Sequence, residues 1–344
     1  MKLAGITILF YYGVIMSKTA HIDQPLDNNL SRFGRKWEIS VQTTEGLVVL
    51  SDNEKEDDNV ALRCTFEIDR PGFQAPAYSD ICVYNITPEL QNLIVNKGMR
   101  VYVSAGYKNG PYGCIYSSKI LHSILERENV VDSKFTMHCI DGYDLLFKNV
   151  IKECRKAGMS QTDIVTYIAG HSEIKMSIQY ISDNLKINKL PRAKVMFGDP
   201  TDFLRDVAIE NDCQWYINDE SLVFGFLQEM QERASAIVYS PENGLIGTPQ
   251  QTQEGVDFTV LLDPRIHIKK PGMQIKLDNS LIQIQKRYQN QVVLPLDQDF
   301  YCMVGKFHHS GDTRGNNWYT HIMGLNTIGR LMSAMDDFNT QMAY

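Results

Sequence analysis

The chain has 344 residues, enough for two or three domains with a sizeable core. Hydrophobic residues make up 43% and charged residues 22%, a composition that excludes an intrinsically disordered chain. The formal net charge of -7 is not the overall basic charge typical of proteins that bind nucleic acid tightly.

The seven cysteines are scattered singly along the chain, and no two of them form a CxxC pair. An odd number at this spacing argues against a disulfide framework and against a zinc knuckle. We expect the thiols to be reduced and mostly buried, which indicates folding in a cytoplasm.

The N-terminal segment, residues 1–30, begins with an apolar run from Leu3 to Met16. The run is too short for a membrane-spanning helix but resembles the apolar core of a signal peptide. The alternatives are a packing arm, or an extension upstream of a natural start at Met16. The unpaired cysteines favour an arm or extension.

Residues 31–128 are dominated by short segments in which apolar and polar residues alternate, as in β-strands. In ALRCTFEID, for example, every second residue is apolar. A single helix is expected, with Thr87 as its cap, Pro88 at its first position and Gly98 at its end. Strands are expected at 36–43, 47–50, 61–69, 80–86, 100–107 and 114–125. This pattern predicts a compact barrel.

Residues 129–240 indicate a mixed α/β region that starts with a strand at 134–140. Ser160 and Asp163 have the spacing of a capping box, and Asp199-Pro200 is typical of a second helix start. The segment QWYINDESLVFG, residues 214–225, predicts a hairpin that turns at Asn218-Asp219.

Residues 241–330 are again rich in strand patterns, and residues 331–344 are expected to form a loose tail. Strands are expected at 256–262, 273–277, 281–285, 300–309 and 318–326. The predicted fold is therefore mainly β, with two tube-like β-barrel domains and an α+β insert between them.

The stretch HHSGDTRGNNWYTHI, residues 308–322, concentrates titratable side chains. His308 and His309 are adjacent in a predicted strand, so they point to opposite faces and cannot both bind one metal ion. A structural zinc site needs four converging ligands, and the members of a Ser-His-Asp triad usually come from separate elements. SGDTRGNN has the composition of a turn, and we expect Asp312 and Arg314 to hold that turn together or to contact a neighbouring subunit.

Other chemical motifs are weak or missing. The sequence has no P-loop, no GxGxxG after a strand and no HExxH. Glu126 and Glu128 are neighbours, but proximity alone does not predict a glycosidase pair. We expect the remaining aromatic and histidine side chains to be packed or solvated, with a sugar-binding tyrosine face as the alternative: Tyr78, Tyr84, Tyr107, Tyr112, Tyr116, Trp37, Trp215, Trp318, His122 and His138. We therefore predict no catalytic, cofactor-binding or metal-binding residue, and no enzyme.

Four stretches together resemble the central baseplate hub proteins of contractile bacteriophage tails, and they cover most of residues 33–326. They are FGRKWEISV; FEIDR with VYNITPE, VYVSAGY and GCIYSSKI; GDPTDFLRDVAIENDCQWYINDESLVF; and LIGTPQQTQEGVDFTVLLDPRI with FHHSGDTRGNNWYTHIMGLN. The string GDTRGNNWYT is the most specific part, whereas the apolar N-terminal extension departs from the family pattern.

The resemblance implies a structural role in the virion, after assembly in the host cytoplasm. Such hubs are homotrimers in which two barrels per subunit form a six-part ring. The ring joins a sixfold tail tube above to a threefold central spike below, beside baseplate wedge proteins. DNA passes through the lumen without specific binding, and no cofactor or stable membrane insertion is implied. Two alternatives remain open: a tail-associated peptidoglycan hydrolase, and a secreted carbohydrate-binding β-protein.

Overall fold

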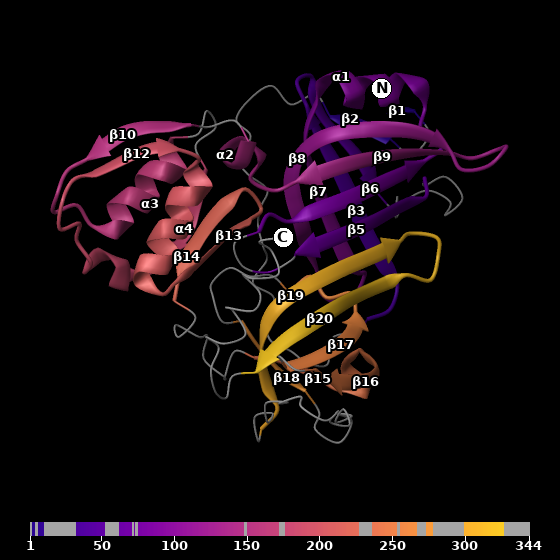
Figure 1. Cartoon of the computed structure of the whole chain (residues 1–344). Coiled ribbons are helices and arrows are strands. Elements are labelled where there is room, and N and C mark those ends of the chain that lie inside the picture. The colour runs from indigo at the N-terminus through magenta and orange to yellow at the C-terminus, as the bar shows by residue number, and fades with distance from the viewer. Residues whose placement is uncertain are drawn as a thin grey trace.

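The structure, a computed structural model, describes residues 2–3, 6–9, 32–51, 62–70, 72, 75–147, 150–171, 176–226, 236–252, 255–266, 273–277 and 299–326 (Figure 1). Within these ranges, no helix is long and apolar enough to cross a membrane. The expected strand at 281–285, the tail at 331–344 and most of the N-terminal segment lie outside the described residues.

The first strand-rich half forms one antiparallel sheet in the order β1-β2-β4-β3-β7-β8-β9-β6-β5. Its strands are β1 (Lys2–Leu3), β2 (Ile6–Leu9), β3 (Arg35–Thr43), β4 (Gly46–Ser51), β5 (Cys64–Arg70), β6 (Tyr78–Tyr84), β7 (Gly98–Tyr107), β8 (Tyr112–Arg127) and β9 (Ser133–Ile140). Strand β5 buries every second residue, as the alternating sequence predicts. Strand β2 pairs along β4, so part of the N-terminal segment extends this sheet, as a packing arm would.

The helix of this half, α1 (Pro88–Lys97), begins and ends where the sequence predicts. The Thr87 side chain accepts a hydrogen bond from the Leu90 backbone N–H, and the Gly98 N–H bonds to the Ile94 carbonyl. Because Leu90 and Ile94 are one turn apart, both enter the core beneath the helix.

The middle region forms a lobe beside the strand-rich body (Figure 1). Its elements are α2 (Tyr143–Phe147), β10 (Ile151–Arg155), α3 (Gln161–Gly170), β11 (Ser177–Ile181), η1 (Asp183–Lys186), β12 (Lys194–Gly198), α4 (Pro200–Asn211), β13 (Gln214–Asn218) and β14 (Ser221–Gly225). The predicted capping box at Ser160 and Asp163 is present, and Asp199 caps α4. Two small sheets, β10-β12 and β11-β14-β13, accompany the helices.

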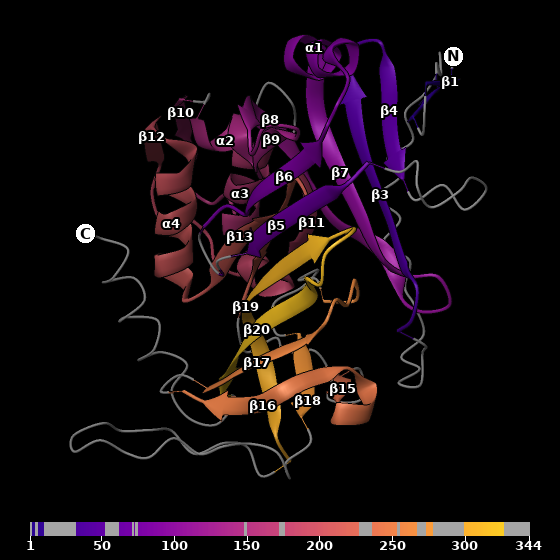
Figure 2. The same ribbon diagram turned by 90° about the vertical axis from the view of Figure 1, so that its right-hand side faces the viewer.

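The second strand-rich half comprises β15 (Ile237–Tyr239), η3 (Pro241–Asn243), β16 (Leu245–Gln251), β17 (Gly255–Leu261), β18 (Gln274–Leu277), β19 (Tyr301–Asp312) and β20 (Trp318–Asn326). Its main strands follow the order β19-β20-β17-β16 and join the first sheet where β19 pairs with β5 (Figure 2). The mainly β fold with a mixed middle region is thus confirmed.

The described residues form three hydrophobic cores, one in each part. The β13–β14 hairpin contributes to two of them because its side chains alternate. Trp215 and Ile217 enter the core of the middle region, whereas Tyr216 enters the core of the second strand-rich half. This hairpin therefore fixes the middle lobe to the strand-rich body.

Two local predictions were wrong by a few residues. The hairpin turns at Asp219-Glu220, not at Asn218-Asp219, because Asn218 pairs with Ser221. Both turn residues have positive φ, as the two-residue turn of a tight hairpin requires. Strand β19 also extends through Ser310 and Gly311 to Asp312, which the sequence assigned to the turn.

Candidate functional site

The junction between the two strand-rich halves is a continuous antiparallel pairing of β5 with β19. It runs from Arg70 opposite Phe307 to Thr65 opposite Asp312. The polar stretch at 308–322 lies along this junction, so its side chains divide between an outer face of the sheet and the interior.

His308 lies on the outer face between two carboxylates of β5. Its Nε2 is 2.7 Å from Glu67, and its Nδ1 is 3.8 Å from Asp69. Hydrogen bonds to Asp69 and Glu67 raise the pKa of His308 to about 9, despite its partial burial. A protonated His308 therefore joins the two halves at neutral pH.

His309 points into the interior, as the opposite-face prediction requires, and is fully buried. Its Nδ1 lies 2.8 Å from the Thr320 hydroxyl on the neighbouring strand. Burial, together with nearby Arg70, lowers the pKa of His309 to about 3. The imidazole is therefore neutral, and its hydroxyl partner is Thr320 rather than Ser310.

Asp312 organises the loop between β19 and β20, as predicted. Its carboxylate accepts hydrogen bonds from the Arg314 backbone N–H at 2.9 Å and from the Arg63 guanidinium at 2.7 Å. Burial raises the pKa of Asp312, but these hydrogen bonds outweigh it and hold the pKa below its usual value. Arg35 of β3 donates to the Asp312 and Asn316 carbonyls and covers the Trp318 ring. Two arginines of the first half thus fasten this loop.

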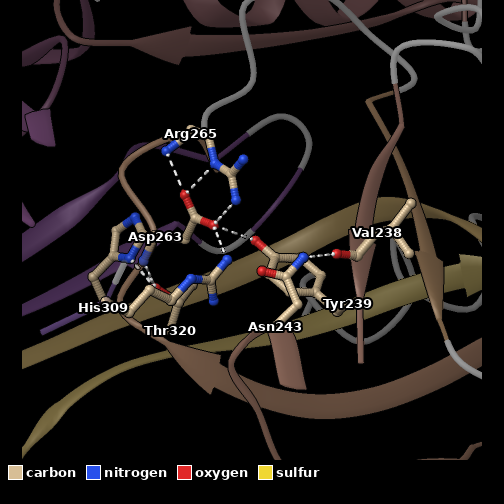
Figure 3. Close-up of polar contacts among 8 residues, drawn as sticks. Val238, Tyr239, Asn243, Asp263, Arg265, His309 and Thr320 are labelled. Atoms are coloured by element: carbon tan, nitrogen blue, oxygen red, sulfur yellow. Dashed lines mark hydrogen bonds and ion pairs between the residues drawn. The ribbon is translucent and has the colours of Figure 1, made fainter. Parts of the chain in front are cut away.

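A second contact between the halves is built around Asp263, which is fully buried (Figure 3). Its carboxylate accepts from the Arg265 guanidinium at 2.9 and 2.7 Å, from Arg32 at 3.1 Å and from the Tyr239 hydroxyl at 2.9 Å. Burial raises the pKa of Asp263, and the two arginines offset this and lower it overall. Arg32 precedes β3, so this cluster ties the start of the first half to the second.

A third buried cluster joins the first half to the turn of the β13–β14 hairpin. The Arg70 guanidinium lies 2.6 Å from Asp219 and 3.5 Å from Asp141. Asp141 also accepts from the backbone N–H groups of Asp219 and Glu220, at 2.8 and 2.6 Å. Burial raises the pKa of Asp141 to about 8, although Arg70 opposes this. The carboxyl group of Asp141 thereby holds the left-handed turn in place.

The outer face of the joined sheet carries further histidine–carboxylate pairs. His138 on β9 lies 2.6 Å from Asp80 on β6 and stacks on His122 of β8 with ring centroids 4.5 Å apart. His321 on β20 lies 2.9 Å from Asp257 on β17. Across the part of the chain that the structure describes, no group of three or more such side chains is arranged to hold a metal ion.

The remaining aromatic and thiol side chains are mostly in the cores. Trp37, Trp215 and Trp318 are buried, which confirms that they are packed side chains. The tyrosines do not form one exposed platform, because Tyr84, Tyr107 and Tyr116 are buried and Tyr78 is half-exposed. All seven cysteines are free and only Cys154 is exposed, which confirms the expected unpaired, mostly buried thiols.

Sequence reasoning missed the charges that fasten the three parts together. Arg70 continues the inward-facing series of β5, so a charged residue at a core position was visible in the sequence. The partners of Arg70, by contrast, lie 71 residues or more further along the chain, and no local pattern indicates them.

The sequence and the fold were compared with those of known proteins. A family model described as "Baseplate hub gp41" matches residues 84–282. No curated protein matches the sequence.

Solved structures share the fold at low sequence identity. A tail protein from Neisseria meningitidis aligns with a TM-score of 0.54 and 10% identity, covering 86% of this chain and 98% of that one. A 43 kDa tail protein of a Shewanella oneidensis prophage aligns with a TM-score of 0.54 and 8% identity, covering 84% and 98%. The E. coli c3393 protein, a component of the type VI secretion system, aligns with a TM-score of 0.50 and 10% identity, covering 77% and 73%.

Proposed function

The chain belongs to the baseplate hub gp41 family, and from this premise we propose that it is a structural, non-enzymatic hub of a contractile phage tail. Three copies form a ring of six strand-rich units around the tail axis. The ring connects a sixfold tail tube to a threefold central spike, contacts baseplate wedge proteins, and leaves a lumen through which DNA passes. It is a virion component that assembles in the host cytoplasm.

The observation that carries this proposal is the β5–β19 junction. Two strand-rich halves of one chain share a single sheet, so the chain supplies two adjacent sectors of a continuous wall. Three chains would then supply six such sectors, which suits a sixfold neighbour on one side and a threefold neighbour on the other.

The proposed parts are an N-terminal arm (1–30), a first tube-like barrel (31–128), a middle region (129–240), a second tube-like barrel (241–330) and a tail (331–344). Two of these bounds need correction, because β9 (Ser133–Ile140) pairs within the first sheet and β15 (Ile237–Tyr239) pairs with β18 of the second half. The first barrel therefore extends to Ile140, and the second begins at Ile237. The clusters around Asp263 and Arg70 hold these parts in one rigid body. A hub must keep its shape while the sheath contracts, and such buried, multiply bonded ion pairs suit that demand.

The outer face of the joined sheet suits the wall of a DNA channel. On β5, β6, β8, β9, β17 and β19 it carries the carboxylates Glu67, Asp69, Asp80, Glu126 and Asp257, and the cations Lys134, Lys306 and the protonated His308. Because these five carboxylates outnumber the three cations, DNA phosphates would not be retained. His308, the exposed histidine of the polar stretch at 308–322, is held by two carboxylates of β5.

The test is the mass of the purified protein in solution, measured by light scattering at two concentrations. The proposal expects three times the 39.3 kDa mass of one chain at both concentrations. Electron microscopy of the same sample should show rings with an open centre. A monomer at both concentrations, with no ring on adding the cognate spike, would contradict the proposal.

A further inference from the structure

The two strand-rich halves repeat the same arrangement of four strands. In the first half, the hairpins β5–β6 and β8–β9 lie in the spatial order β8-β9-β6-β5. In the second half, the hairpins β16–β17 and β19–β20 lie in the order β19-β20-β17-β16. Strand β8 therefore corresponds to β19, and β5 corresponds to β16.

The correspondence extends to single residues because both halves have a β-bulge at the same place. The pairing of β8 with β9 shifts between Ile120 and His122. The pairing of β19 with β20 shifts between Val304 and Lys306. Bulges are local features that fix register, so Leu121 corresponds to Gly305.

The bulge marks where β19 changes its partner on one edge. Before it, Tyr301–Met303 pairs with β18 of the same half. After it, Phe307–Asp312 pairs with β5 of the other half. Strand β8 pairs with β7 before its bulge, up to Lys119. Beyond its bulge, no described strand pairs with that edge.

The open edge of β8 has the character of an interface. Leu121 is 47% exposed and Leu125 is 48% exposed, although Leu125 lies opposite the fully buried Phe135. Leu125 corresponds to His309, which is buried at the internal junction. An unpaired edge with apolar side chains is a ready template for another strand.

The opposite end of the sheet offers the matching strand. Strand β16 is the last strand of the sheet, and within the described ranges only β17 pairs with it. From β8 to β16, every neighbouring pair is antiparallel, so β16 runs opposite to β8. Copies related by rotation about one axis therefore bring β16 and β8 together antiparallel.

We infer that β16 of one copy pairs with the outer part of β8 of the next copy, and that this contact repeats the β5–β19 junction between chains. The inference rests on the proposed trimer and names the surface that closes it. Because different surfaces of the two copies meet, the interface is head-to-tail. Such an interface gives a closed ring when repeated rotation from copy to copy leads back to the first copy.

The internal junction also gives the register of this contact. The paired residues can be followed from the bulge across each half. In the first half the series is His122, His138, Asp80 and Glu67. In the second half the corresponding series is Lys306, Met323, Asp257 and Gln250. Glu67 lies opposite Ser310, which is four residues after Lys306. Glu126 is four residues after His122, so Gln250 is expected opposite Glu126 of the next copy.

A cysteine pair tests this register. The double variant Glu126→Cys/Gln250→Cys is made in a Cys154→Ser background, which removes the one exposed native thiol. Mild oxidation should shift most of the protein from the 39.3 kDa band to a covalent band of three times that mass on a non-reducing gel. Neither single variant should shift, and a control pair with its second cysteine on β10, Glu126→Cys/Glu153→Cys, should remain at the mass of one chain.

A second variant tests the β8–β16 contact without introducing cysteines. Leu125→Asp changes a half-exposed side chain, so the single chain should fold normally while the light-scattering mass falls from trimer to monomer. Phe197→Asp on β12, where the side chain is 73% exposed, should remain a trimer.

The outcomes separate this inference from the proposed function. A wild-type trimer in which the 126/250 pair does not cross-link, or cross-links no better than the control pair, would overturn the β8–β16 contact and leave the trimer standing. A wild-type monomer without cross-linking would overturn both.

Discussion

Replacing Arg70 with methionine tests whether the buried charges hold the middle lobe to the strand-rich body. Methionine keeps much of the side-chain volume but leaves Asp219, 2.6 Å away, and Asp141, 3.5 Å away, without their cation. Removing one partner of a buried ion pair costs about 3–5 kcal/mol. The free energy of unfolding should therefore fall by about that amount at pH 7.

The loss should depend on pH in a defined direction. Burial raises the pKa of Asp141 from its ordinary value of 3.8 to about 8, so its contribution to stability is full below pH 3.8 and is lost as the pH rises through 8. Without Arg70, which lowers this pKa, the carboxyl is still harder to ionise. The wild type and the variant should therefore lose stability in parallel from pH 5 to pH 7, and the variant should lose more than the wild type as the pH rises through 8.

Urea denaturation followed by tryptophan fluorescence measures this loss, since Trp215 reports on the middle core and Trp318 on the core of the first strand-rich half. The matched control is Arg205→Met, which removes an exposed arginine 3.0 Å from Asp202 and should stay within about 0.5 kcal/mol of the wild type. A loss below about 1 kcal/mol for Arg70→Met, or one that does not grow between pH 7 and pH 9, would refute the reasoning.

Three further predictions concern the junction and the thiols. His308→Gln should lower the free energy of unfolding by about 0.5–1 kcal/mol at pH 6, because the partly exposed imidazolium pairs with two carboxylates. Since the folded pKa is about 9 and the unfolded value is 6.5, the difference should be full below pH 6.5 and vanish as the pH rises through 9, which urea titrations at pH 6 and pH 10 will show. Gly311→Ala would place its Cβ 2.1 Å from the Phe66 ring and should lower the free energy of unfolding by about 1–3 kcal/mol. The control Gly170→Ala, whose Cβ would have no atom within 4 Å, should not destabilise the protein. Equal effects of the two variants in thermal unfolding would contradict a tightly packed junction. Thiol titration of the folded protein should detect one fast cysteine, and Cys154→Ser should abolish that signal; rapid reaction of more than one thiol would contradict the buried positions of the others.

Features encoded by neighbouring residues could be predicted from the sequence. Thr87, Ser160 and Asp199 cap the three main helices where expected, because a capping side chain bonds to backbone groups two or three residues away. Likewise, buried and more exposed side chains alternate along β5 because successive side chains of a strand point to opposite faces of the sheet.

Features that depend on distant partners could not be predicted in the same way. The hairpin turn lies one residue further along than expected because the Asp141 carboxylate accepts the N–H groups of Asp219 and Glu220. Strand β19 continues through Ser310 and Gly311, despite their turn-like composition, because β5 supplies a pairing edge there. In both cases a tertiary contact outweighs the local preference.

The position of the β5–β19 junction in the chain has a consequence for folding during synthesis. Asp69 and His308 pair across it, and 238 residues separate them in the sequence. At a translation rate of about 5–20 residues per second, β5 waits roughly 12–48 s for its partner to be made. Throughout that interval the first half exposes the edge of β5 as well as that of β8, and chains on one messenger lie close together. A slow, non-local pairing step of this kind favours aggregation. Slower translation lengthens this interval, so at a fixed temperature a larger fraction of the overproduced protein should be lost to aggregates when translation is slowed.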